Sequence, residues 1–403
     1  MVDLDGAAID PLDFLERAVR TPSHDDIGPM CDLLCGELRE AGIEPTVDDA
    51  GNVVATREAS GDAADEPHLV LNTHLDTVSP HVPGERDGDL LHGRGTCDAK
   101  GPLAAMLAAF CGCDPDQGRV TLAVTPDEET RSTGAAALVP SLDLDSHRGD
   151  AVIVGEPTGL DVCSAAKGRF EGRVTITGER AHAAEPDTGR NAISLAAPVL
   201  DALAGFDDRP EGLAAHPDLG APTLTPTLIE GGDATNQVPA TCGIVCDRRS
   251  VPPETTAGFE TALNEYLDEH AAPDAVSFAL TDRETPFLEA FETPADECVV
   301  RVLREASGGA VRPFTAATEA SYFAREVPTV VFGPGDLADG TGPVAHADRE
   351  YVQLPEVERA ASVLADALTE RLREGGLGDR GVRRGVASAF HRIGSILPSW
   401  PSR

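Results

Sequence analysis

The first candidate pair for chemistry is His74 and Asp76, in the segment THLD. They follow an apolar run at residues 68–72, and residues two apart in an extended chain point to the same side. Open α/β sheets bind ligands at the ends of their strands, so this imidazole and carboxylate could bind a metal or move a proton. A surface histidine beside an acid is the simpler alternative, because such neighbours arise by chance in an acidic chain.

Acidic side chains follow two later apolar runs in the same way. Glu128 and Glu129 come after residues 120–125 in TPDEET, and Glu156 ends the run 151–155 in VIVGEPTG. Adjacent acids are expected by chance in a chain with 69 Asp and Glu residues, so the pair alone shows nothing. Its position is informative, because three successive strands would each deliver a ligand-type side chain at one end.

Glycines surround a further carboxylate, Asp98, in the segment HGRGTCDAKG, and they let the backbone bend tightly around it. An ordinary turn before a helix is the simpler interpretation. Lys100 weighs against it, because it is one of only two lysines in the chain. A phosphate-binding loop would need GxxxxGK followed by Ser or Thr, which is missing.

Two histidines complete the candidates: His182 in ERAHAAEP and His346 in GPVAHADREYV. Histidine is the commonest metal ligand and the usual acid or base near neutral pH, although a lone histidine is more often structural. The neighbouring sequence must decide between these two interpretations.

The composition excludes several classes of function. The chain has 403 residues with 69 acidic and 32 basic side chains, and its formal net charge of -37 repels the phosphates of nucleic acids. No apolar run approaches the roughly 20 residues of a membrane span, and the start MVDLDGAAID is unlike a signal peptide. We therefore expect a cytoplasmic protein that binds neither nucleic acid nor membranes. Its acidity and scarce lysine suggest a halophilic host.

The elements that must position these side chains alternate between strand and helix over the first 155 residues. This alternation is typical of a sheet covered by helices on both faces. Apolar spacing predicts helices at 10–20, 28–41 and 102–110, and strands at 52–56, 68–72, 120–125 and 151–155. The alternation of strand and helix resumes near the end of the chain, with helix 295–306, strand 329–332 and helix 355–373.

The intervening segment follows a different order, βαββαβ, which is that of the ferredoxin-like split unit. We therefore predict a larger α/β domain in two parts, residues 1–168 and 287–374, with a smaller ferredoxin-like domain inserted at residues 169–286. The basic segment 375–403 is expected to be a disordered tail. The strands and helices of the inserted unit are predicted at 173–178, 190–204, 223–229, 241–247, 254–269 and 275–280.

Taken together, the motifs resemble one family, the dinuclear zinc amidohydrolases that include acetylornithine deacetylase, succinyl-diaminopimelate desuccinylase, aminoacylase and glutamate carboxypeptidases. The resemblance spans roughly residues 10–373 and is closest to the deacetylase and desuccinylase branch. It implies a catalytic α/β domain with an inserted ferredoxin-like lid that often forms a homodimer. The blocks that carry it are NTHLDTV, GRGTCDAKG, TPDEET, GEPTG, GERAHAAEPDTGRNAI, GGDATNQVPA, DRRSVPP, FGPG and AHADREYV.

By this resemblance, Asp98 would bridge two metal ions. His74 and Glu156 would complete one site, and Glu129 and His346 the other. Imidazoles with carboxylates suit zinc, with cobalt or manganese as possible substitutes. Several clustered carboxylates also need the charge of such a metal pair to offset their repulsion.

The resemblance also assigns the catalytic residues. Glu128 would be the general base, and Asp76 would orient His74. His182 on the lid would stabilise the oxyanion, in the neighbouring subunit's site if the lid pairs two subunits, with Asn236 beside it.

Substrate-binding residues follow from looser matches. Arg249 resembles the clamp for a substrate carboxylate, which a guanidinium binds bidentately, and an ordinary surface arginine is its alternative. Arg169 would supply a second cation for a succinyl end. Thr318 lies in the block TAATEAS, which has lost a usual glycine and carries Glu319 where Asp is frequent.

The expected reaction is metal-dependent hydrolysis of the amide bond of a small N-acyl amino acid. Within the branch we favour N-succinyl-LL-diaminopimelate desuccinylase, an enzyme of lysine and diaminopimelate biosynthesis. Acetylornithine deacetylase or a related deacylase is the first alternative, and a dipeptidase or carboxypeptidase is the second. A non-enzymatic binding protein on a degenerate fold is disfavoured, because all five ligand positions and the base are filled.

The charge balance predicts a stability that depends on salt. Because molar salt shrinks the Debye length to about 3 Å, it screens the repulsion among the acidic side chains that destabilises the fold in dilute buffer. We expect a clearly higher melting temperature in molar KCl than in dilute buffer, measured by calorimetry. Equal melting temperatures in the two solutions would contradict a halophilic protein.

Overall fold

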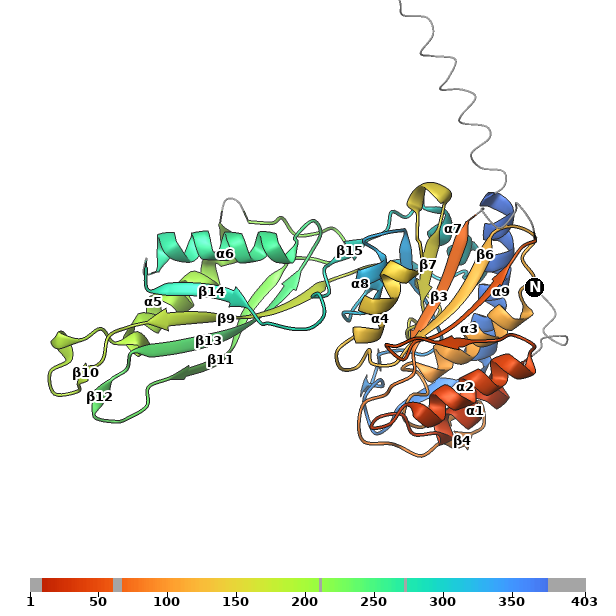
Figure 1. Cartoon of the computed structure of the whole chain (residues 1–403), viewed down its shortest axis with the longest axis horizontal. Helices are drawn as coiled ribbons and strands as arrows, with labels where there is room; N and C mark the ends of the chain where they lie inside the picture. The colour runs from red at the N-terminus through yellow and green to blue at the C-terminus, as the bar shows by residue number, and fades with distance from the viewer. Residues whose placement is uncertain (1–8, 61–66, 210–211, 272–273, 376–403) are drawn as a thin grey trace, which may run out of the picture.

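The computed structural model describes residues 9–60, 67–209, 212–271 and 274–375. The predicted basic tail therefore lies outside the described residues, apart from its first position. A mixed α/β unit forms the larger part, and a smaller α/β unit projects from its side (Figure 1). Among the described helices, none is both long and apolar enough to cross a membrane.

A nine-stranded sheet forms the centre of the larger unit. Its middle strands β6, β3, β7 and β17 are parallel, and antiparallel strands flank them. The path runs through β1 (Thr46–Val47), β2 (Val53–Glu58), β6 (Arg119–Thr125), β3 (His68–His74), β7 (Ala151–Val154), β17 (Thr329–Val331), β8 (Val162–Ala166) and β15 (Phe291–Glu292), with β16 (Val311–Phe314) beside β8.

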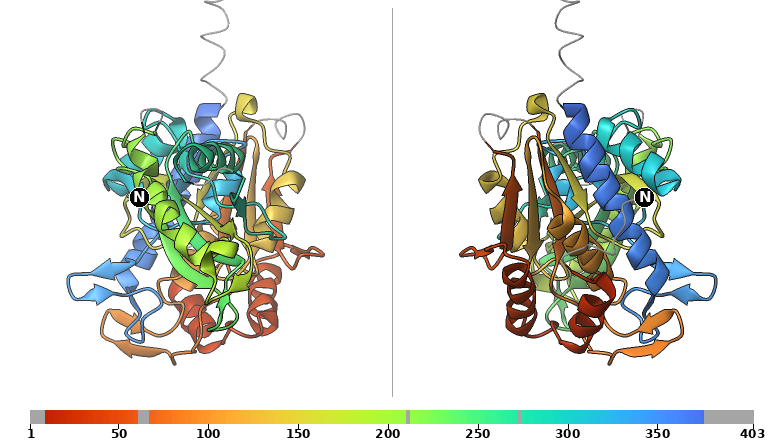
Figure 2. Two further views of the ribbon diagram at one scale, coloured as in Figure 1. Left: turned by 90° about the vertical axis from the view of Figure 1, so that its left-hand side faces the viewer. Right: turned by 90° about the vertical axis from the view of Figure 1, so that its right-hand side faces the viewer.

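Helices cover both faces of this sheet, so its central strands are buried on both sides. Leu69 and Leu71 of β3 pack into the larger core cluster, and Val70 between them packs into the cluster on the other face. Figure 2 shows the long helix α9 along one side of the strands. The first face carries α1 (Pro11–Arg20), α2 (Gly28–Glu40), α3 (Lys100–Gly112), α7 (Cys298–Ser307) and α9 (Leu354–Gly375), and the second carries α4 (Thr133–Leu138) and α8 (Ala320–Phe323).

The smaller unit is a four-stranded antiparallel sheet with two helices on one face, in the chain order βαββαβ. We keep residues 169–286 as its proposed extent and call it the lid. Two short strands, β10 (Ala181–His182) and β12 (Gln237–Val238), pair at the tip farthest from the larger unit (Figure 1). The remaining elements of the lid are β9 (Gly168–Thr177), α5 (Ala192–Gly205), β11 (Thr223–Gly231), β13 (Thr241–Ser250), α6 (Thr256–His270) and β14 (Val276–Leu280).

The predicted long elements are present within a few residues of their expected bounds, but short strands were missed. The strand β8 escaped prediction because its sequence VCSAA has small side chains and only Lys167 separates it from β9. The other missed strands have two to four residues and no periodicity to read, and the short helices α4 and α8 were missed for the same reason. These strands are β1, β4 (Glu85–Asp87), β5 (Leu90–His92), β10, β12, β15, β16, β18 (Ala338–Asp339), β19 (Gly342–Pro343) and β20 (Tyr351–Gln353).

Strand alternation separates the neighbouring arginines Arg248 and Arg249 of β13. Arg248 is buried under the helices, where it donates hydrogen bonds to both carboxylate oxygens of Asp207 and of Glu254 at 2.7–2.8 Å. Its guanidinium also lies over the rings of Phe206 and Phe259. Arg249 faces the open side of the sheet. One arginine therefore holds the lid core together, and the other is free for recognition.

This separation gives a stability prediction. Arg248→Met should lower the free energy of unfolding of the lid by about 3 kcal/mol, because it leaves buried carboxylates without a counter-charge. The matched change Arg249→Met, on the open face, should stay within about 0.5 kcal/mol of wild type. Denaturant unfolding in molar KCl measures both, and equal losses would contradict the assigned orientations.

Candidate metal centre and adjoining cleft

The carboxyl ends of three parallel strands bring the predicted ligands together. His74 is the last residue of β3, Glu128 and Glu129 follow β6, and Glu156 lies two residues beyond β7. In the sheet, His74 is in register with Thr125 at the end of β6. Parallel strands end at one edge, so side chains distant in sequence converge there.

A buried ion pair positions Asp98, which precedes α3. Arg94 Nη1 lies 2.7 Å from Glu350 Oε2, and both side chains are almost fully buried. The other oxygen of Glu350 accepts hydrogen bonds from the backbone N–H groups of Cys97 and Asp98 at 3.2 and 3.3 Å. Glu350 therefore fixes the backbone that carries the Asp98 side chain. The preceding Gly93 and Gly95 have positive φ angles, which lets the glycine-rich segment bend here as predicted.

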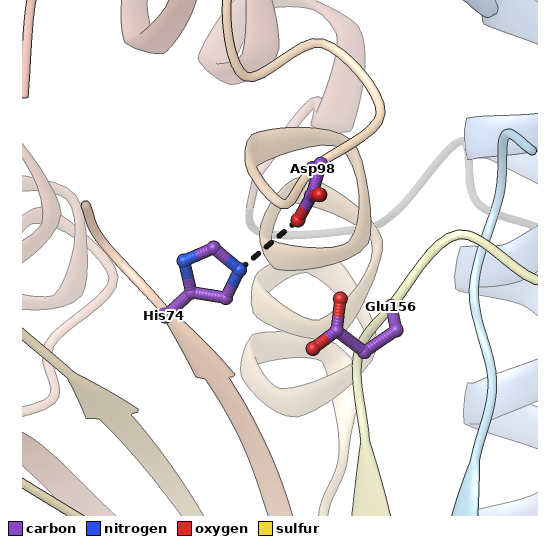
Figure 3. A group of neighbouring side chains, drawn as sticks. All are labelled: His74, Asp98 and Glu156. Atoms are coloured by element: carbon purple, nitrogen blue, oxygen red, sulfur yellow. Dashed lines mark hydrogen bonds and ion pairs between the residues drawn. The ribbon is translucent and has the colours of Figure 1, made fainter. Parts of the chain in front are cut away.

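Asp98 belongs to two groups of side chains that could each hold a metal ion. Within each group the potential ligand atoms all lie within 4.8 Å of one another. The first group is His74, Asp98 and Glu156, which point toward one another in Figure 3. The second is Asp98, Glu129 and His346. Asp98 Oδ1 lies 3.2 Å from His74 Nε2, and its Oδ2 lies 3.1 Å from His346 Nε2.

Asp76 lies behind the first group and fixes its geometry. His74 Nδ1 is 3.0 Å from the backbone oxygen of Asp76 and 3.2 Å from its Oδ1, so a proton on Nδ1 leaves Nε2 free to face Asp98. The two carboxylate oxygens of Asp76 also accept hydrogen bonds from the backbone N–H groups of Glu128 and Glu129, both at 3.1 Å. One carboxylate thus fixes both the imidazole and the loop that carries the two glutamates.

Protonation within this cluster responds to the crowding of charge. Burial and the charge of Glu156 raise the pKa of Glu128 well above its usual range, and burial and Asp98 raise that of Glu156 to about 8. Hydrogen bonds to Asp98 and Glu129 raise the pKa of His346 to about 10. Burial raises the pKa of Asp98, but hydrogen bonds from His346 and His74 outweigh it and lower the value below the usual range.

These shifts test whether the cluster fits metal ions. Four carboxylates and two imidazoles within one pocket balance their charge by taking up protons, and a pair of divalent cations would balance it instead. Imidazole and carboxylate ligands together are typical of zinc, cobalt or manganese. The donor set therefore fits a dinuclear metal centre.

A cleft of about 930 Å³ adjoins the cluster and reaches from the larger unit to the lid. Its larger-unit wall includes Asp98, Glu128 and His346, and its lid wall includes Arg169 and Arg249. The structure thus brings both predicted arginines to the same cleft as the predicted ligands.

The three other residues predicted to contact the substrate do not line the cleft. His182 in β10 and Asn236 beside β12 are exposed at the far tip of the lid, away from the cleft (Figure 1). Their segments are tied together, because the N–H of Ala183 donates to the backbone oxygen of Asn236. Thr318 is fully buried, and its hydroxyl donates to Glu156 Oε1 at 3.2 Å, so it contacts a potential ligand and does not line the cleft.

The sequence held no signal for Glu350, marked Glu319 only as a departure from the family pattern, and did not show the role of Lys100. Glu350 is one of 69 acids, and only the fold shows that it supports Asp98. Glu319 is buried near the cluster and accepts a hydrogen bond from Thr125, and burial raises its pKa to about 7. Lys100 did stand out, but its role is structural: its Nζ donates to the backbone oxygens of Ala18 and Thr21, tying α1 to α3.

A family profile and similar sequences agree on the family to which the chain is related. The sequence profile of peptidase family M20/M25/M40 matches residues 70–370. An acetylornithine deacetylase of Myxococcus xanthus is 33% identical over 378 residues, covering 87% of this chain and 94% of the relative. A protein of Pyrobaculum aerophilum, named as a hydrolase of LysW-lysine and LysW-ornithine, is 29% identical over 362 residues, covering 89% of this chain and 96% of the relative.

Solved structures share the fold. Aminopeptidase PepT of Bacillus cereus superposes with a TM-score of 0.70 at 20% identity, covering 91% of this chain and 100% of that one. A dinuclear metal-binding M20 peptidase of Bacillus subtilis superposes with a TM-score of 0.65 at 12% identity, covering 91% of this chain and 98% of that one.

Proposed function

Because the chain belongs to peptidase family M20/M25/M40 and is a metal-dependent hydrolase of amide bonds, we propose that it cleaves the amide bond of an N-acyl amino acid. One observation carries this proposal most directly. Two potential metal sites share Asp98 beside a cleft whose opposite wall presents arginines. Such a cleft suits a small substrate that has an amide near the metals and a carboxylate toward the lid.

We assign the metal ligands on this geometry. Asp98 would be shared between two ions, which zinc fits best and cobalt or manganese would suit as well. When bound, such ions polarise an amide carbonyl and lower the pKa of water. His74 and Glu156 would hold one ion, and Glu129 and His346 the other.

Glu128 is the proposed general base. It lines the cleft but belongs to neither group of potential ligands, and Asp76 holds its backbone. At this place beside the candidate ligands, its carboxylate could take a proton from the attacking water and return it to the leaving amine. The guanidinium groups on the lid wall would hold the substrate carboxylate and thereby place the amide beside Glu128.

Two acyl groups are candidates. The deacetylase relative favours an N-acetyl amino acid such as N-acetylornithine. The arginines that line the cleft favour a more acidic substrate, and they keep N-succinyl-LL-diaminopimelate desuccinylase as the second candidate. A succinyl group has a carboxylate that an acetyl group lacks, so charge is the property that separates the two.

We also propose that the chain forms a homodimer through the lid. The outer strand β11 carries Leu228 and Ile229, which are 62% and 54% exposed, and Ile193 on the neighbouring α5 is 48% exposed. An exposed apolar strand edge of this kind favours pairing with a second copy. Pairing through the lid would also give His182, remote from its own cleft, a route to the partner's site.

A substrate screen tests the function. The metal-loaded enzyme in molar KCl should hydrolyse N-acetyl or N-succinyl amino acids, measured by release of the free amine. Dipeptides and peptide C-termini should be poorer substrates by kcat/KM. A preference for dipeptides would contradict the deacylase assignment and favour a peptidase.

Removing the base should separate metal binding from catalysis. Glu128→Gln keeps a polar side chain of similar size but cannot accept the proton, so we expect full metal content and a loss of about 10²-fold or more in kcat. His346→Ala and Glu129→Ala should instead lose bound metal, measured by atomic absorption. Full activity in Glu128→Gln would show that another group is the base.

The dimer can be tested at the edge strand. Leu228→Glu should give a monomer by light scattering in molar KCl, because it places a charge in the proposed interface. Val47→Glu, at an equally exposed apolar position on β1, is the matched control and should leave the dimer intact.

Measuring kcat in two variants tests whether catalysis depends on the dimer. His182→Ala should lower kcat by about 10²-fold without changing metal content or assembly, as expected for a lost oxyanion contact. Leu228→Glu should show a similar loss. A wild-type monomer with full activity would contradict both parts.

A further inference from the structure

Four arginines line the cleft: Arg131, Arg169, Arg249 and Arg283. They are concentrated here although the protein has a formal net charge of -37. Their partners differ, and this difference divides them into groups with separate roles.

Arg169 and Arg249 form one unit. They are direct cross-strand partners on β9 and β13. Asp247, on the same face, accepts the Nε–H of Arg249 on Oδ1 at 2.8 Å and the Nε–H of Arg169 on Oδ2 at 3.2 Å. Among the described residues, the Nη atoms of neither arginine donate a hydrogen bond. Asp247 therefore holds the inner edges of two guanidinium groups and leaves their outer nitrogens available to the cleft.

This arrangement changes the role expected for Arg169. The sequence suggested that Arg169 and Arg249 bind opposite ends of the substrate. Two guanidinium groups fixed to one carboxylate are too close to serve distant groups, and they suit one carboxylate gripped from two sides.

Arg283 is independent of this unit. Its Nη2 donates to Thr285 Oγ1 at 2.6 Å and to the backbone oxygen of Arg131 at 3.4 Å, and its guanidinium lies over the ring of Phe287. These contacts fix the group beside the loop that carries Glu128 without neutralising it.

Arg283 is also the cleft arginine that has no carboxylate partner in the described part of the chain. Arg131 lies 3.6 Å from Glu284, and Arg169 and Arg249 share Asp247, whereas no acid lies within ion-pair distance of Arg283. A fixed cation without a counter-charge, at a cleft in a strongly acidic protein, is a ready site for an anionic group.

The first anion-binding subsite of the cleft is therefore the carboxylate clamp of the proposed function, formed by Arg169 and Arg249 around Asp247, and we propose that Arg283 forms a second, separate subsite. The first binds the α-carboxylate of the substrate, and Asp247 is its positioning residue. The second binds another acidic group, on the acyl chain or on the amino-acid side chain. This inference rests on the proposed hydrolysis of N-acyl amino acids and narrows the substrate to molecules with two anionic groups.

The second subsite is tested with matched substrates. The kcat/KM of the wild type is measured for N-succinyl-L-leucine against N-acetyl-L-leucine, and for N-acetyl-L-glutamate against N-acetyl-L-glutamine. We expect a preference for the acidic member of one pair, which identifies where the second anion lies. Arg283→Gln should lose about 30-fold on that member and change little on its neutral counterpart.

Arg325→Gln is the control for the second subsite. Arg325 also packs over an aromatic ring and donates to the backbone oxygen of Phe287, but it pairs with Glu289 and does not line the cleft. Arg325→Gln should leave the ratio of kcat/KM between the acidic and the neutral substrate unchanged in both pairs. An equal effect of Arg283→Gln on acidic and neutral substrates, or no wild-type preference in either pair, would overturn the second subsite.

The first subsite is tested by comparing substrates that have an α-carboxylate with the corresponding α-carboxamides. Arg169→Gln, Arg249→Gln and Asp247→Asn should each raise KM for N-acyl amino acids, with a much smaller effect on kcat and on the corresponding α-carboxamides. The contrary outcome is that Arg169→Gln raises KM only for substrates with a succinyl group, and Arg249→Gln only for substrates with an α-carboxylate. That result would show that the two arginines act separately and that the shared subsite is wrong.

Binding distinguishes failure of this inference from failure of the proposed function. If the metal-loaded enzyme hydrolyses none of these substrates, the deacylase assignment fails. Calorimetric titration with N-succinyl-L-leucine and N-acetyl-L-glutamate still tests the subsites. Arg283→Gln should weaken binding of one of them about 30-fold, and unchanged affinity for both would reject the second subsite.

Discussion

The concentration of negative charge at one edge of the central sheet is the constraint on which the rest of the structure depends. Asp98, Glu128, Glu129 and Glu156 lie together there, and burial intensifies their repulsion. Raised pKa values at Glu128 and Glu156 are the direct consequence. Only bound cations, together with neighbours that fix the backbone against this repulsion, can keep such a group ionised and in place.

Neighbouring polar groups supply that fixation. Asp76 accepts hydrogen bonds from the backbone of two of the glutamates, and Glu350, paired with Arg94, does the same for Asp98. Lys100 adds a tie between α1 and the start of α3. Each of these groups is buried and finds its partner inside the protein, so these contacts stabilise the loops of the site.

The lid supplies the opposite charge. Its sheet buries Arg248 under the helices and turns Arg249 toward the cleft, so strand alternation alone decides which arginine stabilises the fold and which can meet a substrate. A cleft with the candidate metal ligands on one wall and guanidinium groups on the other, beside Glu171, orients a substrate that has an amide at one end and a carboxylate at the other.

The sequence by itself determined the family, the α/β class and the ligand-type residues, because motifs such as NTHLDTV and AHADREYV are local and specific in order. It also predicted the long strands and helices, whose periodicity is local too. Only the tertiary structure decided which further side chains support this cluster and which predicted ones lie away from it. It placed His182 far from its own cleft, bound Thr318 to Glu156, and gave Glu350 and Asp247 their roles. Such contacts join residues remote in sequence, and among 69 acids no local pattern distinguishes those that will be buried beside a partner.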